Sequence, residues 1–201
     1  GIGSSTSTTY KTIGAGGGSL ATIDAAGSLR NGPQSAGSRP GPAAYGNGGE
    51  EPTNTDANLV LGRLGERLVG GGMSLDREAA EDAIRERVAE PLGLELHEAA
   101  NAIIAVANAN MADAVRIISL QRGYDPREFA LVVFGGAGPL HGAALAKELG
   151  VPTVLVPPRP GTWSALGCLM VDIRHDLSEM FLRPAADADA GELAQAFEHL
   201  E

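Results

Sequence analysis

Cysteine, aromatic residues and positive charge are all scarce in this chain of 201 residues. Its one cysteine, Cys168, excludes an internal disulfide and any zinc site built from several cysteines. Cys168 lies in a small apolar stretch with no basic residue nearby in sequence, so we expect a packed, unreactive thiol. Aromatic residues make up only 4% of the chain, so its core must rest on Ala, Val, Leu and Ile.

The charge balance argues against a nucleic-acid partner. The formal net charge is -10 at pH 7 and no stripe of Lys and Arg occurs, whereas proteins that bind a phosphate backbone cluster those residues. No apolar run approaches the roughly 18 residues typical of a membrane span, and no secretory signal is recognisable. We therefore predict a cytoplasmic protein that binds neither nucleic acid nor a membrane.

Both ends of the sequence lead us to expect a fragment of a longer protein. The chain opens on Gly1 without an initiator Met and closes inside a predicted helix, residues 191–201. Residues 1–9 are Gly, Ser and Thr apart from Ile2, and we expect a disordered or cut end there.

The apolar pattern predicts a mixed α/β fold. Ile13, Leu20, Ile23 and Leu29 recur between turn signals, which is typical of short strands joined by tight turns. An ordered irregular loop is expected over residues 32–51, where Pro and Gly are frequent. Three helices should follow: one capped by Thr55 or Asp56 and running to Leu64, one capped by Ser74, and a long one over residues 96–122.

A strand, helix and strand are predicted next, with a parallel pairing of the two strands. The strands are expected over residues 129–134 and 153–156, with a helix over residues 139–149 between them. A short helix over residues 161–169 and a strand over residues 171–181 complete the prediction.

The turn before that helix carries the strongest chemical signal. Gly135, Gly136, Ala137 and Gly138 have little or no side chain, so a ligand can approach the backbone closely. Pro139 suits the first turn of a helix, whose free N–H groups attract phosphate. A nucleotide is the natural ligand, and a plain strand-to-helix turn is the structural alternative.

A second glycine segment precedes it by more than one hundred residues. Gly16, Gly17 and Gly18 could cradle a phosphate or a substrate through successive N–H groups, or could form a strained hairpin connection. Two better-known motifs do not fit either segment. A dinucleotide-binding GxGxxG starting at Gly136 meets His141 in place of its third glycine, and no Gly-Lys pair of a P-loop occurs.

Several motifs together resemble the hydantoinase A and 5-oxoprolinase family, a branch of the actin-like ATPase superfamily. FGGAGPLH over residues 134–141 resembles its adenosine-contacting motif. The other matches follow the order of the family: IGAGGGSL over 13–20, GPQSAGSRPGPAAYG over 32–46, TDANLVL over 55–61, GYDPR over 123–127 and SALGCLMVDIRHD over 164–176.

The resemblance implies a partial actin-like (ribonuclease H-like) ATPase lobe with an inserted helical region. Residues 10–182 would be the adenosine-side lobe of a hydantoinase A domain, and residues 183–201 the start of a following segment. The parent enzyme would use ATP and Mg²⁺ to phosphorylate the oxygen of a cyclic amide, which water then opens. Its partners would be adenine nucleotide, the cyclic amide, and the remaining lobes or a hydantoinase B-type subunit.

This sequence departs from the family in two places. Many members carry Cys where Ala44 stands, so a thiol role is absent there. The two phosphate motifs of the family, each an aspartate near a glycine-threonine pair, are not found, and the opening GSSTST lacks the aspartate. We therefore expect the chain to bind adenine nucleotide without hydrolysing ATP, and its catalytic residues are not identified.

Three acidic or imidazole side chains are candidate metal ligands. Asp56 is either a helix cap or a carboxylate for a metal or a water. Asp172 and His175 belong to a D-x-x-H-D cluster whose members face opposite sides of a strand, so a shared metal would need a bend. His141 lies one turn into the predicted helix, where it could contact the ligand or, as we expect, be a polar side chain of the cap region.

Three other functions stay open at this stage. The first is a non-catalytic association module, since a partial lobe should expose apolar surface. The second is a subunit fragment of a related ATP-dependent ketone carboxylase. The third is a nicotinamide-binding protein, which the misplaced third glycine disfavours.

Overall fold

The computed structural model describes residues 12–68, 72–170 and 189–200 as a mixed α/β chain. Its strands are β1 (Ser19–Ile23), β2 (Leu29–Ser35), β3 (Arg67–Leu68), β4 (Met73–Ser74), β5 (Ala130–Val132) and β6 (Thr153–Leu155). Its α-helices are α1 (Asn54–Val60), α2 (Arg77–Ile84), α3 (Glu90–Leu92), α4 (Leu96–Gln121), α5 (Gly138–Leu149), α6 (Trp163–Met170) and α7 (Ala190–Leu200). Short 3-10 turns lie at η1 (Ala43–Tyr45), η4 (Pro126–Glu128) and η5 (Pro160–Thr162), and a π-helical turn, η3 (Arg85–Ala89), joins α2 to α3.

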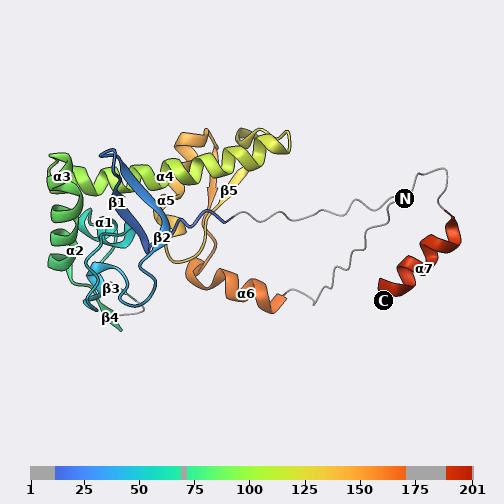
Figure 1. Ribbon diagram of the computed structural model, residues 1–201, viewed down its shortest axis with the longest axis horizontal. Helices are drawn as coiled ribbons and strands as arrows, with labels where there is room; N and C mark the ends of the chain where they lie inside the picture. Colours follow the sequence, from blue (N-terminus) through green and yellow to red (C-terminus); the bar gives the residue numbers. More distant parts are fainter. Residues whose placement is uncertain (1–11, 69–71, 171–188, 201) are drawn as a thin grey trace. The chain divides into compact units, whose positions relative to one another are not determined.

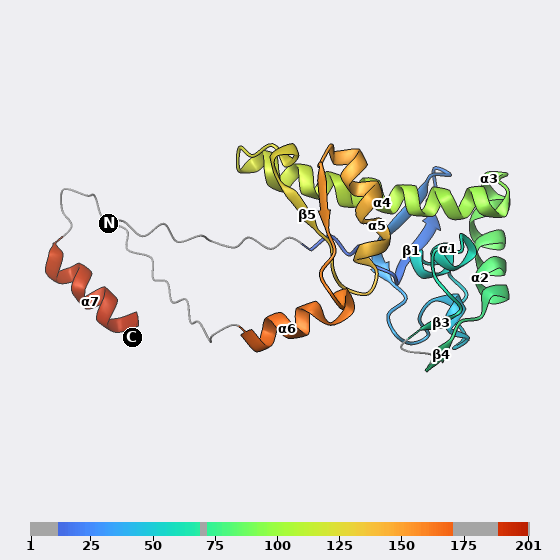
Figure 2. The same ribbon diagram turned by 180° about the vertical axis from the view of Figure 1, so that it is seen from behind.

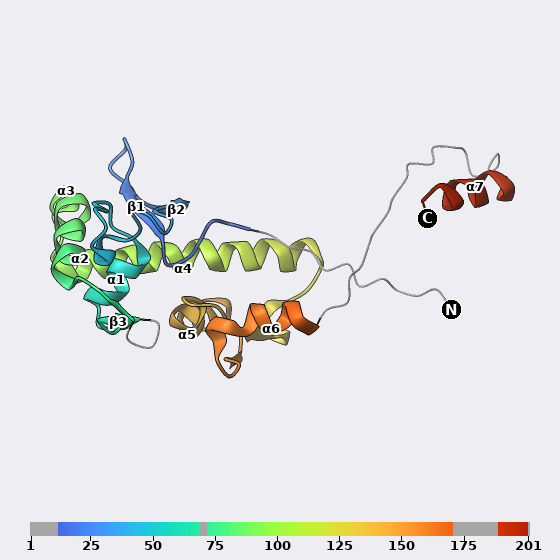
Figure 3. The same ribbon diagram turned by 90° about the horizontal axis from the view of Figure 1, so that it is seen from below.

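The chain divides into two units, residues 1–164 and 165–201. Within the first unit, α4 lies along two groups of elements (Figures 1 and 3). One group holds the β1–β2 hairpin with α1 and α2, and the other holds β5, α5 and β6. Ile103 and Ile104 of α4 lie in the core of the first group, and Ala112 lies in the core of the second. One long helix therefore fixes the two groups relative to each other.

The predicted strand–helix–strand unit is confirmed. β5 and β6 pair in parallel, with Val132 opposite Leu155, and α5 packs against both strands (Figure 2). The strands are three residues long, shorter than predicted, and α5 begins at Gly138. Leu131 and Val154 pack into the core below α5, whereas Val132 and Leu155 are about half exposed on the other side.

The glycine-rich start of the chain forms the predicted strands. β1 and β2 make an antiparallel hairpin, and the irregular segment after it begins at Ala36, because β2 continues through Ser35. The turn that joins β1 to β2 is held together by Asp24, whose side chain accepts hydrogen bonds from the N–H groups of Ala26 and Ser28, both at 2.9 Å. This is the turn chemistry that aspartate favours.

Two helix starts differ from the sequence expectation. Thr53, and not Thr55 or Asp56, is the N-cap of α1, and the helix ends at Val60 rather than Leu64. Asp76, and not Ser74, caps α2, because Ser74 is paired in β4. The long helix predicted over residues 96–122 is confirmed as α4.

The expectation for Cys168 is wrong, since the thiol is exposed. Every residue of α6 is exposed, so no neighbour encloses it. The strand predicted over residues 171–181 lies outside the described residues.

One helix of the described residues, α4, is long and apolar enough to cross a membrane by length and composition alone. The prediction from the sequence considered only uninterrupted apolar runs. α4 is not such a run, because it contains Asp113 and Arg116, although its residues are apolar on average. Among the described residues, α4 packs against α1, β2 and α5.

Candidate functional site

The two glycine segments singled out in the sequence line one cavity. Its volume is about 1100 Å³, and its walls include residues 15–18, 134–138 and 140–141. Thr55 and Asn58 of α1, Met111 of α4 and Tyr45 also line it. We call this space the large cavity. Of the residues predicted to bind the nucleotide, all but Pro139 are among the lining residues.

The first glycine segment is held by the start of α1. The carbonyl of Gly17 accepts hydrogen bonds from the backbone N–H of Thr55 at 2.8 Å and from its hydroxyl at 3.0 Å. The amide of Asn54 donates to the carbonyl of Gly16 at 2.8 Å. A Cβ on Gly17 would lie 2.9 Å from Thr55 Oγ1, so the segment is also packed closely against this side chain. α1 thus fixes the segment from behind.

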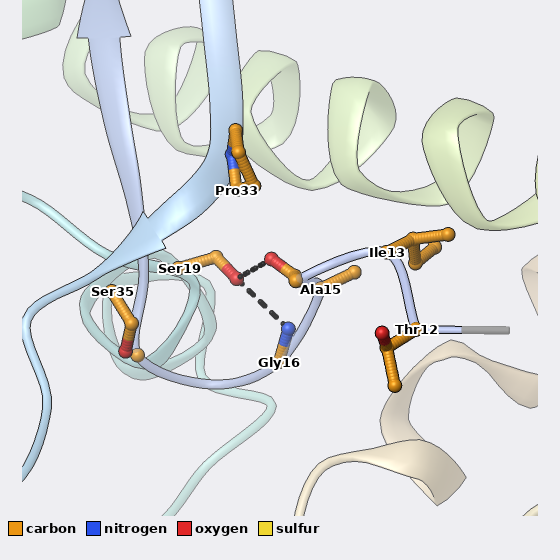
Figure 4. Close-up of a pocket in the computed structure, with 9 residues that line it drawn as sticks. Thr12, Ile13, Ala15, Gly16, Ser19, Pro33 and Ser35 are labelled. Carbon is orange, nitrogen blue, oxygen red and sulfur yellow. Dashed lines mark hydrogen bonds between the residues drawn. The ribbon is translucent and has the colours of Figure 1, made fainter.

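The other side of the same segment borders a smaller cavity of about 490 Å³ (Figure 4). Ser19 closes the turn there: its hydroxyl accepts from the N–H of Gly16 and donates to the carbonyl of Gly14, both at 2.9 Å. The turn is therefore an ordered structure between two cavities, and not a free linker.

The second glycine segment leaves its backbone open. Gly135 has a φ of 87°, which an L side chain rarely adopts, and its N–H donates to the carbonyl of Pro160 at 2.9 Å. A Cβ on Gly136 would meet nothing within 4 Å. No side chain caps the start of α5 at Ala137, so the helix presents its N-terminal end to the cavity.

His141 is buried instead of lying on the surface near the helix start. It is 2% exposed and its Nδ1 lies 2.7 Å from Oδ1 of Asn108 on α4. Burial lowers the pKa of the ring, and the charge of Arg63 lowers it further. The ring is therefore neutral at neutral pH.

Asp56 is the third residue of α1, and its side chain completes the capping box with the N-cap Thr53. Its carboxylate accepts from the N–H of Ala44 at 2.8 Å and from the N–H and hydroxyl of Thr53, both at 2.7 Å. Burial raises the pKa of the carboxyl, and the same three donors act to lower it. With its oxygens directed at these donors and its side chain fully buried, Asp56 does not face either cavity.

The remaining metal candidates, Asp172 and His175, lie outside the described residues. Within residues 12–68, 72–170 and 189–200, no group of three His, Cys, Asp or Glu side chains could hold a metal ion.

Several lining residues were not singled out as site residues in the sequence, and Asn58 and Tyr45 are two polar examples. Asn58 lies one turn after Asn54 on α1, inside the TDANLVL motif, and is 2% exposed. Tyr45 follows the GPAA segment of the irregular loop. Asn58 and Tyr45 each lie in one of the sequence motifs described above, and this was the signal available in the sequence. Only the fold brings α1 beside residues 135–138.

Comparison with known proteins then decides the family. The profile described as hydantoinase/oxoprolinase matches residues 4–177. The chain belongs to this family.

Relatives in the family act in ATP-dependent chemistry. Caprolactamase subunit alpha of Pseudomonas jessenii is 50% identical over 167 residues, which are 83% of this chain and 24% of that protein. The gamma subunit of acetophenone carboxylase of Aromatoleum aromaticum is 43% identical over 181 residues, 87% of this chain and 24% of that protein. This member of the family thus spans about a quarter of the length of these curated relatives.

A solved structure supports the same relationship. The crystal structure of the ATP-dependent caprolactamase from Pseudomonas jessenii has a TM-score of 0.75 and 46% identity, covering 94% of this chain and 28% of that chain. The α/β fold of this member is therefore shared with the matching part of a longer enzyme.

Proposed function

We propose that this member of the hydantoinase/oxoprolinase family supplies the adenosine side of a nucleotide site, as a partial lobe of an actin-like ATPase fold, and does not hydrolyse ATP by itself. The large cavity carries the proposal, because two glycine segments far apart in sequence open into it. Its volume of about 1100 Å³ is ample for a nucleoside, since ligand pockets run from roughly 300 to 1,000 Å³.

The lining of the large cavity suits the uncharged part of a nucleotide. Among the described residues that line it there is no Asp, Glu, Lys or Arg, whereas a transferring phosphoryl group needs cationic neighbours or a metal. We therefore assign the base and sugar to the cavity and the phosphates to its rim. Mg²⁺ accompanying ATP would be held by the phosphates and by groups beyond the described residues.

In the longer protein, the reaction we favour is ATP-dependent opening of a cyclic amide. Phosphorylation of the amide oxygen makes the ring carbon more electrophilic. Water then adds to that carbon, the C–N bond breaks to give an amine and an acyl phosphate, and a second water releases phosphate and leaves the carboxylate. Caprolactamase, the relative at 50% identity, is named for a cyclic amide. The remaining lobes or a hydantoinase B-type subunit would supply the phosphate-binding and substrate residues, in a cytoplasmic enzyme.

A second candidate reaction follows from the other relative. Acetophenone carboxylase, at 43% identity, is named for a ketone. The carbonyl oxygen of a ketone enolate accepts a phosphoryl group as an amide oxygen does, so the same nucleotide side serves both reactions. The difference between the two lies in residues outside the large cavity.

Isothermal titration of the chain with ADP tests the proposal. We expect weak binding at one site and no release of phosphate from ATP. The variant Gly136→Leu should lower the affinity at least about 10-fold, because its side chain enters open space in the cavity. Gly65→Leu is the matched control, since its Cβ also meets nothing within 4 Å and it does not line the cavity. Absence of ADP binding, or steady ATP turnover by this chain, would overturn the proposal.

Association without nucleotide is a competing role that the exposed apolar side chains support. Val132, Phe134 and Leu155 are each 45% to 51% exposed. Light scattering with and without ADP separates the roles: a stable oligomer that neither binds nor responds to ADP favours association alone.

A further inference from the structure

Two buried asparagines meet behind the first glycine segment. Asn31 of β2 is 8% exposed and Asn54 of α1 is fully buried. Their amides bond face to face: Nδ2 of Asn31 donates to Oδ1 of Asn54 at 2.7 Å, and Nδ2 of Asn54 donates to Oδ1 of Asn31 at 3.3 Å. Neither side chain lines the large cavity or the smaller one. The pair can therefore act on a ligand only through other residues.

Asn31 fixes the orientation in which Asn54 holds Gly16. The amide nitrogen of Asn54 also donates to the carbonyl of Gly16 at 2.8 Å, and Gly16 lines the large cavity. Turning this amide over would set its oxygen against the carbonyl of Gly16 and its nitrogen against the nitrogen of Asn31. The bond from Asn31 thus determines which end of the Asn54 amide faces Gly16.

The other contacts of Asn31 reach the long helix α4. Asn110 of α4 donates to the backbone carbonyl of Asn31 at 3.1 Å, and Nδ2 of Asn31 donates to the carbonyl of Ile103 at 3.5 Å. The same helix packs against α5, whose first residue, Gly138, lines the large cavity. A line of hydrogen bonds therefore joins the helix that supports one wall of the cavity to the glycine segment that forms another.

An apolar pair would stabilise this place about as well as the two amides do. A buried amide must recover the cost of leaving water through its hydrogen bonds. When both partners of such a bond are replaced by apolar groups of the same shape, the change is nearly neutral or stabilising. A fully bonded polar pair instead specifies one arrangement, because its bonds form only in that geometry. The pair therefore points to a requirement for position and not for stability.

We propose that Asn31 and Asn54 are positioning residues for the nucleotide, and that they hold Gly16 where the large cavity fits a nucleoside. This inference rests on the proposed function. Asn54 acts through the backbone of Gly16, and Asn31 acts through Asn54. Loss of the pair should weaken nucleotide binding without weakening the fold.

The key variant is the double change Asn31→Leu with Asn54→Leu, which replaces both amides by apolar groups of similar size. We expect its affinity for ADP to fall about 10-fold, because Gly16 loses the bond that fixes its place. Its melting temperature should equal or exceed that of wild type, since both partners are replaced together. The carbonyl of Gly16 keeps its bond from the N–H of Ser19, at 3.2 Å, so it is not left without a donor.

The control Ile84→Ala separates position from stability. Ile84 is fully buried in the same core as α1 and lines neither cavity. Its truncation should lower the melting temperature, because it leaves a cavity in the core. At a temperature where this variant is folded, its ADP affinity should equal that of wild type. A 10-fold loss of affinity here as well would overturn the inference, since general loosening would then explain both results.

A measurement on wild type keeps the test decisive if the double variant does not fold. In NMR spectra of the ¹⁵N-labelled chain, the side-chain amide signals of Asn54 should shift when ADP is added, because the nucleoside lies against the backbone of Gly16. Those of Asn101, an exposed asparagine of α4 that lines neither cavity, should not shift.

Two outcomes overturn this inference alone. One is that the Asn54 signals do not move at saturating ADP, and the other is that the folded double variant binds ADP as tightly as wild type. Absence of ADP binding to wild type overturns the proposed function, and this inference with it.

Discussion

At the scale of single residues, neighbouring glycines of the first segment differ in what surrounds them. A Cβ on Gly17 would lie 2.9 Å from the hydroxyl oxygen of Thr55, whereas one on Gly16 would meet nothing within 4 Å. Neither glycine has a positive φ. Space alone, and not backbone conformation, therefore separates the two positions.

Gly17→Ala should destabilise the chain by about 1 kcal/mol, because it displaces the hydroxyl of Thr55 from the carbonyl of Gly17. Gly16→Ala should leave the free energy of unfolding unchanged or raise it slightly, since it restricts the unfolded chain. Urea denaturation of both variants measures the difference. Equal stability of the two would contradict the packing described at Gly17.

The burial of His141 should make the stability depend on pH. Its pKa is lowered in the folded chain from the ordinary 6.5, so the unfolded chain binds the proton more readily. The stability that the neutral ring of His141 contributes is therefore fully present above about pH 6.5. It is lost as the pH falls from there through the pKa that the ring has in the folded chain. Between pH 7 and pH 5, wild type should lose more stability than His141→Gln, which does not titrate. Parallel losses in both proteins, by urea denaturation at each pH, would count against this reading.

At the scale of elements, α4 is the helix on which both cores depend. Its buried residues Ile103 and Ile104 pack with α1 and α2, and Ala112 packs with α5. Asn110 also donates to the carbonyl of Asn31 in β2 at 3.1 Å. The helix was predictable because its apolar period and length are strong signals. The elements that α4 packs against could not be predicted, because an apolar face does not specify which other element will cover it.

Ile103→Ala should lower the free energy of unfolding by about 3 kcal/mol, because it leaves a cavity in the core. Ile117→Ala makes the same change on the same helix at a residue that is 42% exposed, and should cost less than about 1 kcal/mol. Thermal and urea denaturation give both values. A cost for Ile117→Ala as large as that of Ile103→Ala would mean that α4 is not oriented as described.

At the scale of the whole molecule, the β5–β6 sheet is covered on one side and bare on the other. Parallel sheets are ordinarily covered on both faces. Here Val132 of β5 and Leu155 of β6 are 48% and 51% exposed, Val156 just after β6 is 54% exposed, and Val154 packs into the core. Exposed apolar patches of this kind mark interfaces, which agrees with a chain that spans about a quarter of its relatives' length.

The double variant Leu155→Thr with Val156→Thr should reduce self-association without lowering the melting temperature. Val154→Thr, the matched change on the covered side, should cost about 1–2 kcal/mol by burying a hydroxyl, and should leave association as it is. Light scattering and thermal denaturation separate the two effects. Loss of stability in the double variant would show that the exposed side is packed.

The sequence by itself determined the α/β class, the long helix, the parallel strand–helix–strand unit and the family, because local periodicity and ordered motifs carry all four. It also indicated that Asp56 could cap a helix, but not that Thr53 starts that helix. Only the tertiary structure brought residues 16–18 and 135–138 to one cavity, more than one hundred residues apart in the chain. It also left one polar atom of each of two buried side chains, Oδ1 of Asn58 and Nε2 of His141, without a hydrogen bond among the described residues. The physical reason is that distance along the chain says little about distance in space, and burial is a property of the packed molecule.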